Sequence, residues 1–180
     1  MLKLGPKEMK GKIWDEGGKS EIVQILISHE EETIRAMQFA YVVDGKVLLS
    51  QIYGELTGLN FDTVTFNRPC EYLVSISGEY DIDGTLVSVA FRTNHKKYGP
   101  FGGFDDSESG YDKFKYNFGS SFGGFHGSVD KSCVHSIGVY VKPVSSLAEK
   151  NHRKPPHYRK TPSHDVFGTF PDLTVAFVIS

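Results

Sequence analysis

The residues best able to do chemistry stand in one short segment, Asp130-Lys131-Ser132-Cys133-Val134-His135. On a regular strand, side chains two residues apart point to the same face, so Cys133 and His135 would lie close enough for the imidazole to activate the thiol. The sequence places no third group beside them to orient the imidazole, and a cysteine next to an apolar residue usually serves packing. We therefore expect no catalytic residues here and no enzyme activity.

Two other groups of polar residues could bind ions. Three histidines, His152, His157 and His164, lie near the end of the chain, but their spacings do not match the short ligand patterns of zinc sites, and no cysteine accompanies them. The acidic run 105–109 lacks the glycine and the terminal glutamate of a calcium-binding EF-hand loop. We expect no metal and no other cofactor, and we interpret these segments as a solvated tail and an exposed hairpin loop.

Charge and hydropathy limit the classes of partner. The 180 residues include 20 Lys and Arg against 22 Asp and Glu, so the net charge is −2 and no overall field draws the chain to nucleic acid. The basic stretch Arg153–Lys160 could contact RNA or anionic lipid, but a solubilising linker is the simpler interpretation. No window approaches the ~20 apolar residues of a membrane span. We expect neither a nucleic-acid partner nor a membrane span.

Cysteine use and processing signals bear on the compartment. Cys70 and Cys133 are too few for a disulfide framework, and no Asn-x-Ser/Thr acceptor for glycosylation occurs in the sequence. The start of the chain lacks the apolar run of a signal peptide. These features fit a reducing compartment, so we predict a cytoplasmic or nucleocytoplasmic protein.

Apolar residues alternate with a period of two in several parts of the chain, and this pattern predicts β-strands on both sides of the segment Asp130–His135. The expected strands lie at Met37–Tyr41, Val87–Phe91, Ile137–Val141, Glu21–Ser28, Val47–Gln51, Asp62–Phe66 and Glu71–Ser77. Turn residues such as Asp44-Gly45 and Asp83-Gly84 separate them at short intervals. No window up to residue 144 keeps an apolar stripe at helical spacing. The pattern indicates an all-β sandwich, barrel or prism of antiparallel strands.

The composition changes after residue 144. Residues 150–160 are basic and contain prolines that exclude regular helix and central strand, which is typical of a linker. Beyond it, Leu173–Ile179 is one more apolar segment, too short to form a second core. We predict one domain over residues 1–144 and, over residues 145–180, a basic Pro-containing linker with a short apolar end that the domain does not need.

Several landmarks stand in the order found in one known family. They are Gly11-Lys12-Ile13-Trp14-Asp15, Pro69-Cys70-Glu71-Tyr72-Leu73, the glycine-punctuated stretch Thr93–Gly102, Phe122-Gly123-Gly124-Phe125-His126-Gly127 and Ile137-Gly138-Val139-Tyr140. With these landmarks the chain resembles a jacalin-related lectin domain from about Gly5 to Pro143. The resemblance implies a plant protein with a β-prism fold, in which three four-stranded Greek-key antiparallel sheets surround a pseudo-threefold axis.

The resemblance also implies a sugar site that needs no metal, at one end of the prism. In the family, the backbone of a glycine three residues before the Trp-Asp pair contacts the sugar, and Gly11 has that place relative to Trp14. Glycine suits the role because it lets a ring hydroxyl approach the main chain. The internal position of this glycine resembles the mannose- and glucose-preferring branch, so we expect mannose- or glucose-containing glycans as partners. Weak sites of this kind usually act together, so we also expect a homo-oligomer.

The second loop of the family's site carries a Gly-x-x-x-Asp motif whose aspartate accepts hydrogen bonds from the sugar. Counting back from Ile137 places Lys131 where the glycine belongs and His135 where the aspartate belongs, with Ser132 and Cys133 between them. The motif is therefore lost, and Asp130 could supply the missing acid if the loop folds back toward Gly11. The sequence predicts a metal-independent lectin with a weakened site. The alternative is a β-prism protein-interaction module that has lost sugar binding.

Overall fold

The computed structural model of the protein describes residues 1–103, 111–130 and 133–143. In these residues the regular structure consists of β-strands, as the alternating apolar pattern predicted, and none of it is a helix long and apolar enough to span a membrane. The first sheet contains β1 (Leu2–Leu4), β13 (Cys133–Val141), β12 (Phe122–Asp130) and β2 (Lys12–Asp15). The second contains β10 (Lys97–Gly102), β9 (Leu86–Thr93), β8 (Leu73–Tyr80) and β11 (Asp112–Asn117). The third contains β5 (Lys46–Leu49), β4 (Thr33–Val43), β3 (Ile22–Glu30) and β7 (Asn60–Thr65), and the short β6 (Tyr53–Gly54) pairs with β4 beside them.

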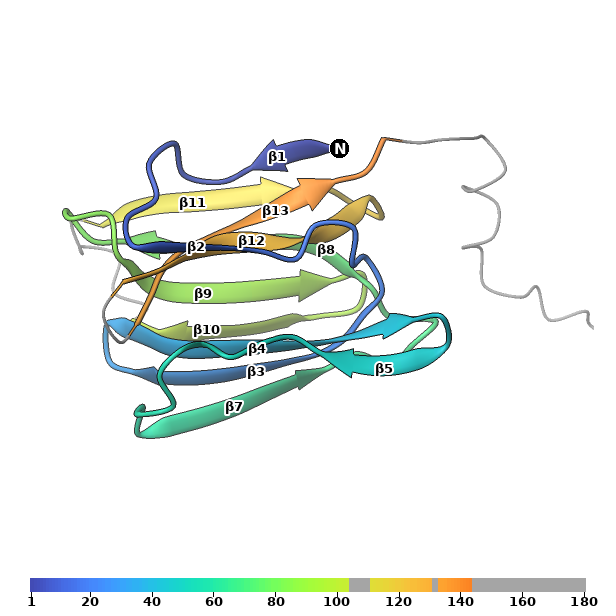
Figure 1. The fold of residues 1–180 in the computed structure, drawn as a ribbon, viewed down its shortest axis with the longest axis horizontal. Helices are drawn as coiled ribbons and strands as arrows, with labels where there is room; N and C mark the ends of the chain where they lie inside the picture. Colours follow the sequence, from blue (N-terminus) through green and yellow to red (C-terminus); the bar gives the residue numbers. More distant parts are fainter. Residues whose placement is uncertain (104–110, 131–132, 144–180) are drawn as a thin grey trace, which may run out of the picture.

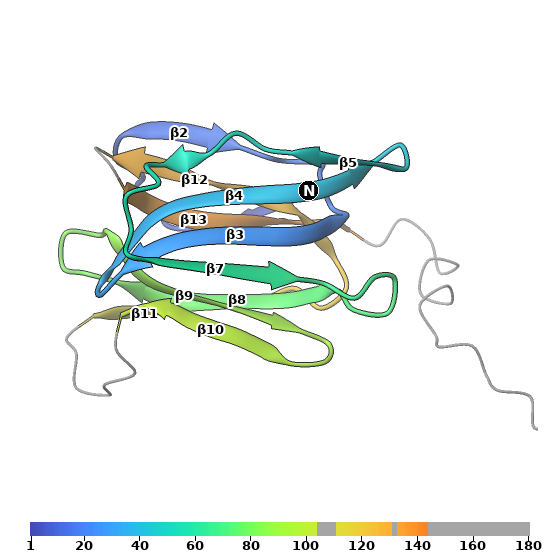
Figure 2. The same cartoon turned by 90° about the horizontal axis from the view of Figure 1, so that it is seen from below.

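The three sheets share one plan. Each has an antiparallel hairpin at its centre, β12–β13, β8–β9 or β3–β4, and one edge strand on either side. The sheets enclose a common core, and the two views show them around a shared long axis (Figure 1, Figure 2). This arrangement confirms the predicted β-prism, with β6 as an addition to the third sheet.

The core is built around one aromatic residue from each sheet. Phe39 of β4, Phe91 of β9 and Phe125 of β12 are fully buried. Phe39 stacks on Phe125 with ring centroids 4.6 Å apart, and Phe91 meets Phe125 edge to face at 6.2 Å. Aromatic pairs in these geometries add stability beyond the apolar area that they bury. The period-two alternation of the sequence therefore sends one face of each sheet to a single core.

The predicted strands correspond to observed strands, with bounds that differ by one to three residues at most ends. Glu71 and Tyr72, for example, precede β8, because the Glu71 carboxylate accepts hydrogen bonds from Asn67 N and Thr93 Oγ1. These bonds hold the chain in a turn before the ladder begins. The predicted boundary at residue 144 and the segment 145–180 lie outside the described residues.

Candidate functional site

Three hairpin turns gather at one end of the prism. They connect β3 to β4, β8 to β9, and β12 to β13, and the loop that leads into β2 reaches the same end (Figure 1). In that loop Lys10 Nζ donates a hydrogen bond to the carbonyl oxygen of Asp83, 2.7 Å away in the β8–β9 turn. The end of the prism therefore joins loops from distant parts of the chain, which is how a small β domain assembles a binding surface.

Gly11 lies directly against the end of β12. Its φ angle is +78°, and a Cβ atom added there would stand 2.1 Å from the carbonyl oxygen of Val129 and 3.0 Å from the Cα of Asp130. Lys12 then pairs with Val129 as β2 begins. Only glycine accepts both this backbone conformation and this contact. The structure thus brings Gly11 and Asp130 together.

The β12–β13 hairpin is tight at its tip. Asp130 pairs with Cys133, so Lys131 and Ser132 connect the two strands and lie outside the described residues. The Cys133 thiol is 3.4 Å from the carbonyl oxygen of Asp130, to which it can donate. Asp130 itself is partly exposed. Its backbone lies next to Gly11 at the end of β12.

His135 does not reach the surface beside them. The register moves from Ser128 opposite Ser136 to Val129 opposite Val134, which leaves His135 as the extra residue of a β-bulge. Its side chain is 4% exposed, and neither ring nitrogen has a hydrogen-bond partner among the described residues. Burial lowers the pKa of His135 below its ordinary value, and the positive charge of Lys10 acts in the same direction. The imidazole is thus neutral at pH 7 and held inside the protein.

The structure does not join the cysteine and the histidine in a dyad. A regular strand would place Cys133 and His135 on one face, but the strand is irregular here, and no hydrogen bond joins the thiol to the imidazole. The described residues also contain no group of three His, Cys, Asp or Glu side chains placed to hold a metal ion. What this end of the prism offers a ligand is main chain at Gly11 and a carboxylate at Asp130, a set suited to hydroxyl groups.

One concave feature of the surface was not predicted. A groove follows the outer face of the β10–β9–β8–β11 sheet, and lysines of β10 and β11 line it. The sequence signal for it is the alternation in β11, where Lys113 and Lys115 flank Phe114. That alternation predicts a strand with a basic outer face, but it does not show which strand lies opposite.

Comparison with known proteins adds to this geometry. A family model described as the jacalin-like lectin domain matches residues 4–140. The chain is similar to the protein RESTRICTED TEV MOVEMENT 1 of Arabidopsis thaliana, at 43% identity over 141 residues that cover 74% of this chain and 79% of that protein. It is also similar to Jacalin-related lectin 2 of Arabidopsis thaliana, at 37% identity over 160 residues that cover 79% of this chain and 87% of the relative.

Solved structures give the same result. A mannose-binding jacalin-related lectin from Ananas comosus superposes with a TM-score of 0.62 and 29% identity, covering 79% of this chain and 96% of that one. A mannose-specific jacalin-related lectin from Morus nigra, solved in complex with mannose, superposes with a TM-score of 0.65 and 25% identity, covering 79% and 94%. The fold described above is therefore that of a known group of proteins.

Proposed function

Since the chain belongs to the jacalin-like lectin family, we propose that it is a non-enzymatic protein that binds mannose- or glucose-containing glycans without a metal, through Gly11 and Asp130. The observation that carries this proposal is the contact between Gly11 and the end of β12, with Asp130 partly exposed beside it. Similarity to two solved lectins described as mannose-binding and mannose-specific supports the choice of sugar.

Asp130 takes the role of acceptor in place of His135. A carboxylate has two oxygens that accept hydrogen bonds from neighbouring hydroxyls, and hydrogen bonds to a charged group contribute about 1.5–3 kcal/mol each. His135 is buried and faces no solvent through which a sugar could approach. The site therefore keeps a charged acceptor, but one that stands at the end of β12 rather than in β13.

The geometry also predicts a weak site. Binding near millimolar affinity amounts to about 4 kcal/mol in total, so one carboxylate supplies a large share of it. Gly11 adds main-chain contacts but no charge. We propose that useful affinity for a glycan comes from several such sites in a homo-oligomer, since linked weak sites bind far more tightly than one.

The test is the substitution Asp130→Asn, which keeps the size of the side chain and removes its charge. Titration with methyl α-mannoside and a high-mannose glycan, followed by amide chemical shifts, should show at least a tenfold weaker affinity, the equivalent of about 1.4 kcal/mol. Asp44→Asn is the matched control, because Asp44 lies in the β4–β5 turn at the other end of the prism. Equal affinity of Asp130→Asn and the unmodified protein would show that Asp130 does not contact the sugar.

A second candidate function is a protein-interaction module without sugar binding. Two observations favour it: His135 is buried where the family motif has its acid, and the outer face of the third sheet leaves Val47, Leu49 and Phe61 exposed. Exposed apolar groups on one face are typical of protein-binding surfaces. Unchanged amide shifts at tens of millimolar mannoside would favour this candidate and contradict the first.

A further inference from the structure

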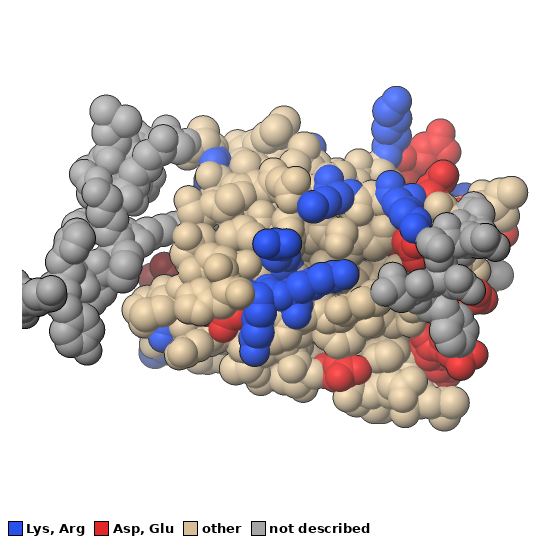
Figure 3. Space-filling model, turned by 180° about the vertical axis from the view of Figure 1, so that it is seen from behind, with Lys and Arg blue, Asp and Glu red and all other residues tan. Residues whose placement is uncertain are grey.

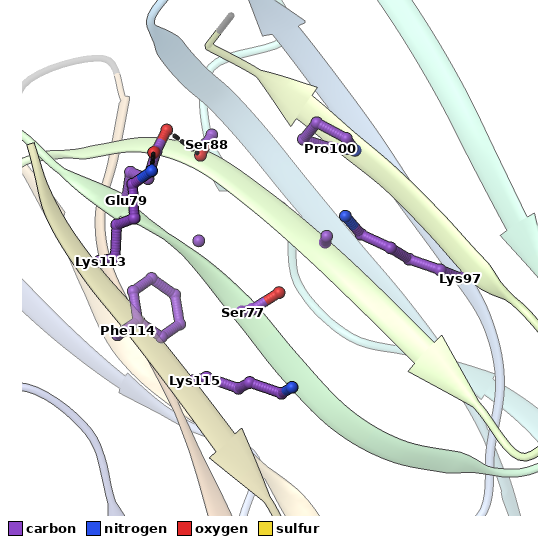
Figure 4. A pocket seen from close by; sticks show the side chains of 10 residues that line it. Ser77, Glu79, Ser88, Lys97, Pro100, Lys113, Phe114 and Lys115 are labelled. Carbon is purple, nitrogen blue, oxygen red and sulfur yellow. Dashed lines mark hydrogen bonds and ion pairs between the residues drawn. The ribbon is translucent and has the colours of Figure 1, made fainter. Parts of the chain in front are cut away.

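The groove on the β10–β9–β8–β11 sheet has a simple physical origin. The two central strands, β8 and β9, present small side chains to the outside, and the two edge strands present long ones. The floor consists of Ser77, Gly78, Ser88 and Ala90, one wall of Lys97 and Pro100, and the other of Lys113, Phe114 and Lys115 (Figure 4). Long walls over a floor of small residues leave an open trough of about 360 Å³ that follows the strands. We call it the lysine groove.

The two walls stand far apart. Lys115 of β11 pairs with Ser77 of β8, and Ser77 pairs with Ala90 of β9, beyond which lies β10 with Lys97. At about 4.8 Å between neighbouring strands, the backbones of the two walls are about 14 Å apart. Lysine side chains extend from both walls over this width. A chain ligand with several anionic groups can therefore contact both walls along the lysine groove.

The charge of the lysine groove is unevenly compensated. Lys113 lies 3.5 Å from the Glu79 carboxylate, which also accepts a hydrogen bond from Ser88 Oγ, so this end of the groove is close to neutral. Lys97 and Lys115 form no ion pair with the residues that the structure describes. Arg92 of β9 pairs in register with Lys97 and adds a further cation beside Lys97. Figure 3 faces this side of the molecule and shows basic side chains gathered near its middle, with acidic ones toward the rim.

We propose that the lysine groove binds a linear acidic oligosaccharide, a chain of sugar rings that bears carboxylate or sulfate groups. Lys97 and Lys115 would hold anionic groups of successive rings, the Ser77 hydroxyl can bond to ring hydroxyls, and Pro100 gives an apolar surface for a ring. An open trough that follows the strands fits a chain that lies along it. The lysine groove shares no residue with the proposed mannoside site at Gly11 and Asp130, so an experiment can contradict either proposal without contradicting the other.

The same observations disfavour a nucleic acid. Single strands bind proteins by stacking bases on free aromatic rings, in addition to phosphate contacts. The aromatic residue in the wall, Phe114, stacks on Tyr80 with ring centroids 4.9 Å apart, and its ring is tilted by 33° against that of Tyr116 at 5.3 Å. Its ring is thus committed to packing.

The experiment uses the full chain and calorimetric titration with three probes. These are an oligogalacturonate of about ten rings, the same oligomer with its carboxylates methyl-esterified, and a heparin-derived oligosaccharide. We expect the first or third to bind, and the esterified oligomer to bind at least tenfold more weakly because it lacks the charges. The first and third probes tell carboxylate from sulfate. Affinity should also fall when NaCl is raised from about 50 to about 300 mM, because salt screens exposed charges.

Two variants locate the binding. Lys97→Ala combined with Lys115→Ala should lower the affinity for the acidic oligosaccharide at least tenfold. Ser77→Glu should lower this affinity further, because it places a carboxylate on the floor of the lysine groove. Lys7→Ala combined with Lys46→Ala is the matched control, since it removes the same charge from exposed residues elsewhere. Both lysine-groove variants should keep the mannoside affinity of the unmodified protein.

Three results would overturn the proposal. The first is no binding of either acidic probe. The second is an equal loss of affinity in the control, which would mean a diffuse charge effect. The third is tighter binding of a single-stranded oligonucleotide of equal charge, which would assign the lysine groove to nucleic acid. Unchanged folding, checked by circular dichroism of each variant, keeps these results interpretable.

Discussion

The two sides of the loop end differ in what holds them. On one side, Gly11 is fixed by backbone, because its φ angle and its contact with Val129 leave no room for a side chain. On the other side, the β12–β13 hairpin carries the chemistry in side chains, and one extra residue in β13 turns His135 into the protein. The difference teaches that a backbone contact persists only with one residue type, whereas a side-chain role can pass to a neighbouring residue, as we propose for Asp130.

Substitution of Gly11 should have the largest effect on stability and on mannoside binding. Gly11→Ala must place a Cβ atom against the Val129 carbonyl in a left-handed conformation, so we expect a loss of about 3 kcal/mol in the free energy of unfolding and no measurable mannoside binding. Gly45→Ala is the control, because Gly45 has a φ of +74° but nothing near its added Cβ. It should lose only about 1 kcal/mol in a urea titration. Equal losses in the two variants would show that the Gly11 contact is not tight.

Substitution of His135 should have a smaller effect on stability, and this effect should depend on pH. A histidine whose pKa is lowered in the folded state binds its proton more readily in the unfolded chain, so stability falls as the pH drops below the ordinary value of about 6.5. His126, whose pKa burial also lowers, contributes in the same sense. His135→Leu removes one of the two contributions and a buried imidazole without a partner, and should raise the free energy of unfolding at pH 7.5 by about 1 kcal/mol.

The measurement is the unfolding midpoint of the His135→Leu variant and of the unmodified protein at pH 7.5 and at pH 5.5. The unmodified protein should lose more stability on acidification than the variant does. A less stable variant with the same pH dependence would mean that the imidazole makes a hydrogen bond in solution, and that the hairpin side is organised differently.

The smallest effect is expected from removal of residues 145–180. The edge and central strands of the first sheet are complete at Val141, so truncation should change the free energy of unfolding by less than about 0.5 kcal/mol and leave the oligomeric mass unchanged. Analytical ultracentrifugation and thermal unfolding of residues 1–145 measure both quantities. A large fall in the midpoint, or a different mass, would show that the apolar segment Leu173–Ile179 adds to the fold.

The sequence predicted the strands because the alternation of residues such as Phe39 and Phe91 reflects a single buried face. The role of Gly11 in sugar binding, which the sequence suggests from the place of this glycine relative to Trp14, stays a prediction. The sequence could not predict the burial of His135. A bulge reverses which residues of a strand face the core, and no residue type in the sequence signals the bulge. The lysine groove was missed for a related reason: Lys97 and Lys115 face each other only once the order of the strands is known.

The single tryptophan gives the molecule an optical reporter. Trp14 is buried, stacks on Tyr53 with centroids 4.3 Å apart, and follows Gly11 by three residues in the strand that pairs with β12. Its emission should therefore be blue-shifted while β2 stays on β12, and should move to the red when that strand detaches. Because the indole lies inside the prism, its fluorescence follows the seating of the Gly11 loop rather than contact with a sugar. A ligand that changes the emission without unfolding the protein would have to act through that loop.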